Sequence, residues 1–218
     1  MMKLSVAIDG PAGAGKSTIA KIIGEKFNLM YINTGSMYRA VTYIALKEKV
    51  SHENLEQLEK LINKIEMHFE GDNLILNGED ITSELTLPYI SNNVSNYAAV
   101  PLVREKMVEK QQEIAKKYDV IMDGRDIGTV VLKDSKFKFY LTASPETRAM
   151  RRYKELKNKN IDVDYDTILQ DIIKRDYIDC NRELNPLTKA EDAIEINSSN
   201  LNIEEVVEVI SKYIKEKL

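Results

Sequence analysis

The most constraining stretch of the sequence is IDGPAGAGKST, which occupies residues 8–18. Gly10, four further residues, and then Gly15, Lys16 and Ser17 match the G-x-x-x-x-G-K-[ST] pattern of a phosphate-binding loop, or P-loop. The pattern follows a short apolar run and precedes a segment whose apolar residues recur at helical spacing. A strand, this loop and a helix are therefore predicted in that order.

Small residues in such a loop let consecutive backbone N–H groups turn inward around a phosphate, at the positive end of a helix dipole. We interpret the loop as a polyphosphate site in which Lys16 reaches the β- and γ-phosphates and the Ser17 hydroxyl ligates Mg²⁺. A glycine-rich turn without a ligand is the alternative. The predicted phosphate-binding set is Gly10, Pro11, Ala12, Gly13, Ala14, Gly15, Lys16, Ser17 and Thr18.

The rest of the chain alternates short β-like runs with longer helix-like runs, which is typical of a parallel sheet covered by helices. We expect one α/β domain over residues 1–218, with a five-stranded parallel sheet flanked by helices. The expected strands are residues 3–8, 29–32, 119–123, 137–142 and 193–196. The expected helices are residues 16–27, 35–48, 53–65, 101–117, 145–158, 165–182 and 202–218.

One stretch departs from this alternation. Residues 67–82, MHFEGDNLILNGEDIT, alternate apolar and polar side chains around Gly-Asp and Asn-Gly pairs, which favour tight β-hairpins. An isolated hairpin of this size is only marginally stable. We therefore expect a small antiparallel β insertion that packs against the main body.

The overall composition argues against several classes of partner. The formal net charge is -4, so the molecule has no general attraction to nucleic acid or to an acidic membrane surface, and no apolar run approaches the length of a membrane span. The single cysteine, Cys180, has no second cysteine with which to form a disulfide or a metal site. We expect a cytoplasmic protein that binds neither nucleic acid nor membrane, and we interpret His52 and His68 as structural.

Arginine is the scarcer basic residue, with only 8 of the 31 Lys and Arg residues, and its planar fork of donors suits phosphate. The stretch NTGSMYRA places a hydroxyl, a tyrosine and Arg39 at the start of the helix after the second strand. The stretch MDGRDIGTVV places Arg125 and Asp126 on a loop that follows the third strand, where ligands bind in open α/β sheets. We expect Arg125 to clamp a phosphate and Asp126 to read the edge of a base. A salt bridge between Arg125 and Asp126 is the alternative.

The remaining arginines fall mainly on two neighbouring helices. Helical spacing groups the charged residues of each on one side, namely Arg148, Arg151 and Arg152 on the first and Arg175, Asp179 and Arg182 on the second. The lysine-rich stretch KELKNKNIDVD joins the two helices. We interpret the pair as a mobile helical lid over a site of phosphoryl transfer, with a solvated charged face as the alternative.

The arginines also bear on what accepts the phosphoryl group. A hydroxyl acceptor needs a base, whereas a phosphate monoester, with a second pKa of about 6, is already mostly dianionic and needs cations instead. No obvious base accompanies the surplus of arginine, which favours a phosphorylated acceptor. The alternatives are a kinase for UMP or for a small hydroxylated metabolite, and a nucleotide-dependent switch. The sequence lacks the Asn/Thr-Lys-x-Asp guanine signature of such a switch.

Together these motifs resemble those of bacterial cytidylate kinases, the (d)CMP kinases among the P-loop nucleoside monophosphate (NMP) kinases. The similar stretches are IDGPAGAGKST, TGSMYR, VSNYAAVPLVRE, DGRDIGTVV, RRY, KRDYIDCNRELNPL and LNIEEVV, which cover almost the whole chain in the expected order. The resemblance implies a P-loop kinase of pyrimidine nucleotide metabolism. It would use Mg²⁺ and transfer the ATP γ-phosphoryl group to CMP or dCMP, giving ADP and CDP or dCDP. We expect a monomer.

The resemblance also implies roles for individual residues. Those expected to bind the acceptor at its corner of the site are Thr34, Tyr38 and Arg39. Ser95 would contact the cytosine and Arg104 the CMP phosphate. Base recognition would fall to Arg125 and Asp126, and Arg175 and Asp179 would lie near the ribose and the transferring phosphate. The expected catalytic cations are Lys16, Arg148, Arg152, Arg175 and Arg182.

The same resemblance divides the chain into three regions. The core would comprise residues 1–34, 101–145 and 183–218, the NMP-binding region with its β insertion residues 35–100, and the lid residues 146–182. Three positions depart from the family's usual pattern: Asn33 and Asn197 stand where Asp is frequent, and Ser36 replaces a small apolar residue.

Overall fold

Five parallel strands form the central sheet of the computed structural model, which describes residues 3–218. The strand order is β2 (Met30–Asn33), β6 (Val120–Gly124), β1 (Ser5–Asp9), β7 (Phe137–Thr142) and β8 (Ile194–Asn197). Every neighbouring pair in this sheet is parallel. The predicted five-stranded α/β sheet is confirmed, and only residues 1 and 2 of the expected core lie outside the described part of the chain.

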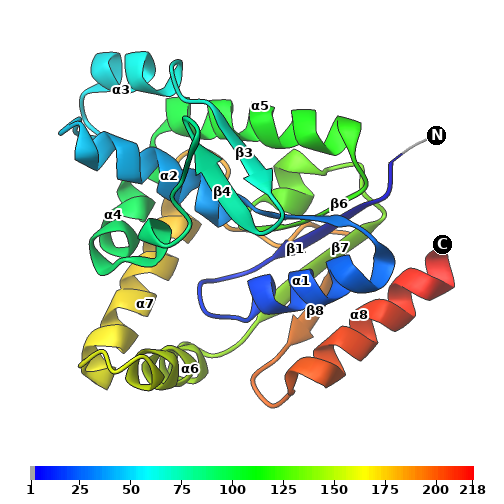
Figure 1. Cartoon of the computed structure of the whole chain (residues 1–218). Coiled ribbons are helices and arrows are strands. Elements are labelled where there is room, and N and C mark those ends of the chain that lie inside the picture. Colours follow the sequence, from blue (N-terminus) through cyan, green and yellow to red (C-terminus); the bar gives the residue numbers. More distant parts are fainter. Residues whose placement is uncertain (1–2) are drawn as a thin grey trace.

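Helices cover both faces of the sheet (Figure 1). On one face lie α1 (Lys16–Phe27) and α8 (Ile203–Lys217), and on the other lie α2 (Thr34–Lys47) and α5 (Pro101–Lys117). Because successive side chains of a strand point to opposite faces, Val6 and Ile8 pack with α1 and α8, whereas Ala7 packs with α2 and α5. Two separate apolar clusters therefore hold the sheet between its helices.

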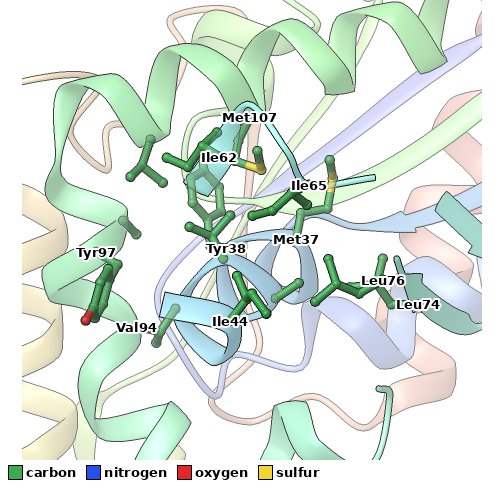
Figure 2. Close-up of a cluster of buried hydrophobic side chains, with 14 of the residues drawn as sticks. Met37, Tyr38, Ile44, Ile62, Ile65, Leu74, Leu76, Val94, Tyr97 and Met107 are labelled. Atoms are coloured by element: carbon green, nitrogen blue, oxygen red, sulfur yellow. The ribbon is translucent and has the colours of Figure 1, made fainter. Parts of the chain in front are cut away.

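The second of these clusters also anchors the insertion. Figure 2 shows Met37 and Tyr38 of α2 packed near Ile62 and Met107, with Leu74 and Leu76 of the insertion beside them. The helices that contribute are α2, α5, α3 (Leu55–Ile62) and α4 (Pro88–Ala99). The insertion is thus held against the main body through its buried face, as the marginal stability of an isolated hairpin requires.

The insertion itself is an antiparallel sheet of β3 (Met67–Glu70), β4 (Asn73–Leu76) and β5 (Glu79–Asp80). Its second turn, Asn77-Gly78, has φ of 50° and 85°, the positive values that a tight hairpin turn of this kind demands. The predicted antiparallel insertion is confirmed. The short strand β5 is an addition to the expected hairpin.

The two arginine-bearing helices, α6 (Pro145–Asn158) and α7 (Tyr165–Asn181), lie side by side at one end of the molecule (Figure 1). They share a small apolar cluster of Ala149, Ile168 and Ile172 that is separate from the two clusters around the sheet. Ser144 and Asp164 cap the N-termini of the two helices. The side chain of each accepts a hydrogen bond from the backbone N–H three residues later in the sequence. The pair therefore forms a unit with its own small core.

Three helical segments were absent from the sequence-based prediction: α4, a short 3₁₀ turn at Glu84–Thr86 and a single π-helical turn at Ile127–Val131. The segment that forms α4, PYISNNVSNYAA, is rich in Asn and Ser, which compete with the helix backbone for hydrogen bonds. A helical signal is nonetheless present, because Pro88 occupies the first turn and Ile90, Val94 and Tyr97 share the buried face. Among residues 3–218, no helix is both long and apolar enough to cross a membrane.

Candidate active site

The candidate site lies where the strands of the central sheet end. Because β1, β2 and β6 are parallel, the loops that follow them meet at one edge of the sheet. These loops are the P-loop after β1, the start of α2 after β2, and the stretch around Arg125 after β6. The sheet topology therefore brings together three motifs that are up to about a hundred residues apart in the sequence.

The P-loop backbone adopts turns that favour glycine. Gly10, Gly13 and Gly15 have φ of 145°, 75° and 93°, and a Cβ atom at Gly10 would collide with the carbonyl oxygen of Leu141. Inside the loop, Lys16 Nζ donates a hydrogen bond to the carbonyl oxygen of Pro11 at 2.7 Å. The lysine is thus folded back over the loop, with its ammonium group at the place where a phosphate would bind.

Burial, and next the positive charge of Arg125, hold the pKa of Lys16 well below its usual value. Arg175 lowers this pKa further, while Asp123 and Asp9 raise it. The ammonium group therefore lies among other cations with too little negative charge to balance them. An anionic ligand at this point would restore the pKa of Lys16.

Asp123, near the end of β6, is the acidic centre beside the P-loop. Its Oδ2 accepts a hydrogen bond from Ser17 Oγ at 2.9 Å, and its Oδ1 accepts one from the hydroxyl of Tyr31 at 2.8 Å. Thr34 Oγ1 donates to the backbone carbonyl of the same residue at 2.7 Å. Ser17, Tyr31 and Thr34 come from three different elements, so the carboxylate is held in a defined place.

A carboxylate beside a P-loop hydroxyl offers the hard oxygen ligands that Mg²⁺ prefers. Within residues 3–218, no group of three or more His, Cys, Asp and Glu side chains is arranged to hold a metal ion. The Ser17 hydroxyl and the Asp123 carboxylate are the oxygen groups beside the P-loop that could take part in such a site. Sequence reasoning singled out Ser17 but missed Asp123, although an Asp at the end of a buried strand in MDGRD was the available signal.

Several arginines converge on the P-loop lysine. Burial, and then the charges of Arg175, Arg125 and Arg152, lower the pKa of Arg39 to about 9. Burial, and then the charge of Arg125, lower the pKa of Arg175 to about 10. Such mutual lowering requires the positive groups to lie close together. The structure thus brings together Lys16, Arg39, Arg125, Arg152 and Arg175 from five different segments of the chain.

These arginines differ in how they are paired. Arg125 Nε donates to Asp179 Oδ2 at 2.8 Å. Burial acts to lower the pKa of Arg125, but the ion pair with Asp179, together with the charges of Asp123 and Asp176, raises this pKa overall. Arg39 donates to Leu85 O and Ser91 Oγ, which are neutral acceptors. The Arg175 side chain makes no hydrogen bond or ion pair within residues 3–218, and its Nε is buried. The cluster therefore contains guanidinium groups that no carboxylate neutralises.

A second network of charges is buried behind the cluster. Asp126 Oδ2 accepts from Arg104 Nη2 at 2.5 Å, and Asp126 Oδ1 accepts from Arg182 Nη2 at 3.3 Å. Arg182 Nη1 also lies 3.9 Å from Asp179 Oδ1, which links the network to Arg125. The alternative of an ion pair between Arg125 and Asp126 is therefore wrong, since each residue pairs with a different partner.

This network changes how Arg104 is interpreted. The resemblance implied a contact with the acceptor phosphate, but Arg104 is only 1% exposed and is bound to Asp126, with its guanidinium 5.1 Å from the ring centre of Tyr38. Arg104 is not among the main charges that lower the pKa of Lys16, Arg39 or Arg175. Its position groups it with Asp126 instead of with the phosphate-binding cations.

Near Arg104, three buried polar atoms lack a hydrogen-bond partner within the described residues: Tyr38 Oη, Arg104 Nε and Gln111 Nε2. Burial raises the pKa of the Tyr38 hydroxyl to about 12. Unpartnered buried polar groups are costly and are uncommon away from functional sites. Gln111 was not expected from the sequence, and Ser95, which was, is half-buried on α4.

The lid arginines also fall into distinct environments. Arg148 is buried. Its Nη1 and Nη2 donate hydrogen bonds to the carboxylate of Asp176 of α7 at 3.2 and 2.6 Å. Its Nη1 also donates to the carbonyl oxygen of Ala12 in the P-loop at 3.0 Å. Arg152 is half exposed and pairs with Glu155 at 2.8 Å. A solvated charged face is therefore wrong for Arg148, which connects the P-loop to both helices. Arg152 of α6 belongs to the cation cluster, because its charge lowers the pKa of Arg39 and of Arg175.

An open pocket of about 490 Å³ adjoins the P-loop on the side of β7 and β8. Pro11, Arg148 and Asp176 line one part of it, and Asn197 at the end of β8 and Ser199 in the loop that follows line another. Cys180, which is exposed, also lies in its wall. A nucleoside attached to phosphates in the P-loop could extend into this pocket.

The remaining predicted residues have clear local roles. Thr18 is exposed on the first turn of α1, and Thr34 is buried. Asn33 caps the start of α2, since its Oδ1 accepts a hydrogen bond from the backbone N–H of Ser36 at 3.0 Å. The amide at this position therefore supports the helix that presents Arg39.

Comparison with known proteins shows which family the sequence resembles. The sequence matches the profile of the family described as "Cytidylate kinase" over residues 6–216. The chain is 63% identical over 217 residues to a cytidylate kinase from Clostridium acetobutylicum, which covers 100% of both chains. It is 65% identical over 213 residues to a cytidylate kinase from Clostridium perfringens, which covers 98% of both.

Among solved structures, an uncharacterized protein from Eubacterium ventriosum has a similar fold, with a TM-score of 0.54 and 14% sequence identity. The match covers 98% of this chain and 99% of the other. At this level of identity the likeness concerns the fold alone.

Proposed function

The chain belongs to the cytidylate kinase family, and we propose that it transfers the γ-phosphoryl group of ATP to CMP or dCMP, giving ADP and CDP or dCDP. The single observation that carries this proposal is the cluster of under-neutralised cations around Lys16, beside a buried network that contains Asp126. The cluster suits two phosphates that must approach each other. The network suits the recognition of a base.

On the donor side, backbone N–H groups of residues 10–15 and the ammonium group of Lys16 are proposed to bind the β- and γ-phosphates of ATP. The adenosine would extend into the pocket beside the P-loop, between Arg148 and the end of β8 with the loop that follows, which carry Asn197 and Ser199. Because Arg148 hydrogen-bonds to both Ala12 and Asp176, it would hold the wall of this pocket in a fixed position relative to the P-loop.

Ser17 and Asp123 are proposed to hold Mg²⁺ together with the nucleotide. When bound, the ion neutralises charge on the β- and γ-phosphates and helps to orient them. Tyr31 and Thr34 fix the orientation of Asp123 through their hydrogen bonds to its carboxylate and its carbonyl group. This arrangement leaves Lys16 and the arginines to neutralise the remaining charge on the phosphates.

On the acceptor side, Arg39, Arg125 and Arg175 are proposed to bind the phosphate of CMP and to guide it toward the γ-phosphoryl group. A phosphate dianion attacks without losing a proton, so the reaction requires no general base. Lys16 and the arginines instead reduce the repulsion between two anions and stabilise the charge on the transferring group. Arg152 of α6, which already belongs to the cluster, would contact the phosphates when the lid helices close.

The cytosine is proposed to be read by Asp126 and Arg104, with Ser95 and Tyr38 at its edges. A carboxylate accepts a hydrogen bond from an exocyclic amino group, and a guanidinium group donates to a ring carbonyl or nitrogen. Cytosine offers both, whereas uracil lacks the amino group. The unpartnered atoms of Tyr38 and Arg104 support the presence of a polar ligand here. Asp179, paired with Arg125, is proposed to lie next to the acceptor phosphate and to contact the ribose.

The three functional regions follow from these assignments. We propose a core of residues 1–34, 101–145 and 183–218, an NMP-binding region of residues 35–100 and a lid of residues 146–182. The separate apolar cluster between α6 and α7 supports the lid as a unit.

A coupled assay of ADP formation at fixed ATP and Mg²⁺ tests the proposed function. CMP, dCMP, UMP, AMP and GMP are each titrated as acceptor. We expect the highest kcat/KM for CMP and dCMP, and a rate near background without an acceptor. A preference for AMP or GMP, or hydrolysis of ATP that is independent of CMP, would contradict the proposal.

A further inference from the structure

Asp9, the last residue of β1, carries a buried carboxylate that no step of the proposed reaction uses. Only 3% of the residue is exposed. Its Oδ1 accepts a hydrogen bond from the backbone N–H of Ile127 at 2.8 Å, and its Oδ2 accepts one from Gly128 at 2.7 Å. Both oxygens face main-chain donors, so the carboxylate is not placed to take a proton from a substrate.

The position of these bonds connects the two halves of the site. Asp9 immediately precedes Gly10, the first residue of the P-loop, whereas Ile127 and Gly128 immediately follow Arg125 and Asp126. One side chain therefore spans from the donor-binding loop to the loop that carries the acceptor-side residues. No other side chain within residues 3–218 hydrogen-bonds to the backbone N–H of Ile127 or Gly128.

The carboxylate acts where the sheet no longer holds the chain. The pairing between β1 and β6 ends with Asp9 opposite Gly124, one residue before Arg125. Beyond this point the chain turns into the π-helical turn at Ile127–Val131 and passes directly over the carboxylate. A Cβ atom on Gly128 would lie 3.3 Å from Asp9 Oδ2 and 3.3 Å from Lys138 Cδ, so the loop has little room to shift.

Keeping a charge at this position is costly, which argues for a purpose. Burial raises the pKa of Asp9 to about 6, while the N–H groups of Gly128 and Ile127 oppose the rise. The charged groups that face it are Asp126, which raises the pKa further, and Lys16, which lowers it. A neutral amide side chain would avoid the cost of burying a carboxylate, but it could not offer a separate acceptor oxygen to each of the two N–H groups.

We propose that Asp9 is a positioning residue for the acceptor side of the site: its carboxylate fixes the loop that carries Arg125 and Asp126 relative to the P-loop. The inference rests on the proposed function, because it concerns the part of the site assigned to CMP. It predicts that loss of the link weakens binding of the acceptor more than binding of the donor. Strand β1, which leads into the P-loop, remains paired with β6 on one side and β7 on the other.

The substitution Asp9→Asn tests this directly. An amide keeps one acceptor oxygen but turns an NH₂ group toward the second backbone N–H, so one hydrogen bond is lost. The Kd for CMP and the Kd for ADP are measured separately by titration calorimetry. We expect the Kd for CMP to rise about tenfold, the scale of one lost hydrogen bond to a charged group, with little change in the Kd for ADP.

Two further variants complete the test. Gly128→Ala keeps the backbone N–H but places a Cβ atom 3.3 Å from Asp9 Oδ2, which pushes the loop and the carboxylate apart. It should give the same split, so it decides the question if Asp9→Asn does not fold. Asp119→Asn is the matched control, because Asp119 Oδ1 accepts from the backbone N–H of Leu4 at 2.7 Å at the opposite edge of the sheet. It should leave both Kd values unchanged.

The outcomes separate the two claims. If the wild-type protein does not bind CMP, the proposed function fails. If the wild-type protein binds CMP, but the Asp9 and Gly128 variants bind it equally well or lose affinity for CMP and ADP to the same extent, the positioning role of Asp9 is overturned.

Discussion

Arg175 offers the sharpest test of the idea that the cation cluster is built for ligands at the expense of stability. Its guanidinium group has no hydrogen bond or ion pair within residues 3–218, and its Nε is buried. The substitution Arg175→Met removes this charge and keeps an unbranched apolar stem of similar reach. We expect the ligand-free variant to be more stable than the wild-type protein, although it loses most of its turnover.

The magnitude follows from the pKa of Arg175, which burial and the charge of Arg125 lower from 12.5 to about 10. At about 1.4 kcal/mol for each pKa unit, this corresponds to a cost of roughly 3 kcal/mol for keeping the group charged. The side chain is partly exposed, so solvent screening reduces the expected gain to about 1–2 kcal/mol. For a chain of this size such a gain raises Tm by about 2–8 °C.

The assay combines thermal unfolding without ligand and steady-state kinetics with CMP. We expect kcat/KM for CMP to fall by about 10²–10³, the scale of one lost cation at a charged transition state. Arg151→Met is the matched control on the neighbouring helix, since Arg151 is paired with Ser198 O at 2.6 Å and Ser198 Oγ at 3.2 Å. The control should lower Tm and retain turnover. A lower Tm for the ligand-free Arg175 variant, or unchanged turnover, would refute the reasoning.

Three further predictions concern other parts of the site. Asp123→Asn should raise the Mg²⁺ concentration for half-maximal activity and weaken Mn²⁺ binding to the ADP complex, measured by electron paramagnetic resonance; equal Mn²⁺ affinity in both proteins would contradict a role at the metal. Arg104→Met should raise KM for CMP and reduce the preference for CMP over UMP without changing the Kd for ADP, whereas loss of ADP binding would speak against a base-reading role. Because the pKa of Asp9 is raised to about 6 in the folded protein from 3.8, the folded state binds this proton first as the pH falls, and the stability of the wild type relative to Asp9→Asn should increase by about 2 kcal/mol between pH 6.5 and 4. Urea unfolding of both proteins across this range measures the change, and a relative stability that does not vary with pH would contradict the assignment.

The sequence predicted most of the fold because its elements have strong periodic patterns. The strands and the helices α1, α5 and α6 were expected within one or two residues of their observed bounds, and the Asn77-Gly78 turn was visible as a dipeptide. Helix α4 was missed because its Asn and Ser residues have weak helical preference. Its formation depends on the burial of Ile90, Val94 and Tyr97, which is a tertiary effect.

The candidate site was less predictable for a related reason. Motif spacing identified the P-loop and the arginines, but it could not say which acid pairs with which base. Arg125 pairs with Asp179, which is 54 residues away, and not with its neighbour Asp126. Asp126 pairs with Arg104, 22 residues before it. Such pairings depend on how loops from different strands meet at the sheet edge, which only the folded chain determines.

The central claim is that one cluster of cations holds two nucleotides end to end. Binding of a bisubstrate analogue, in which adenosine and cytidine are joined through a chain of phosphates, tests this most directly. We expect that one analogue binds per chain, that it displaces both ADP and CMP, and that Arg175→Met weakens its binding sharply. An analogue that displaces only one of the two nucleotides, or that binds the Arg175 variant as tightly as the wild type, would contradict the claim.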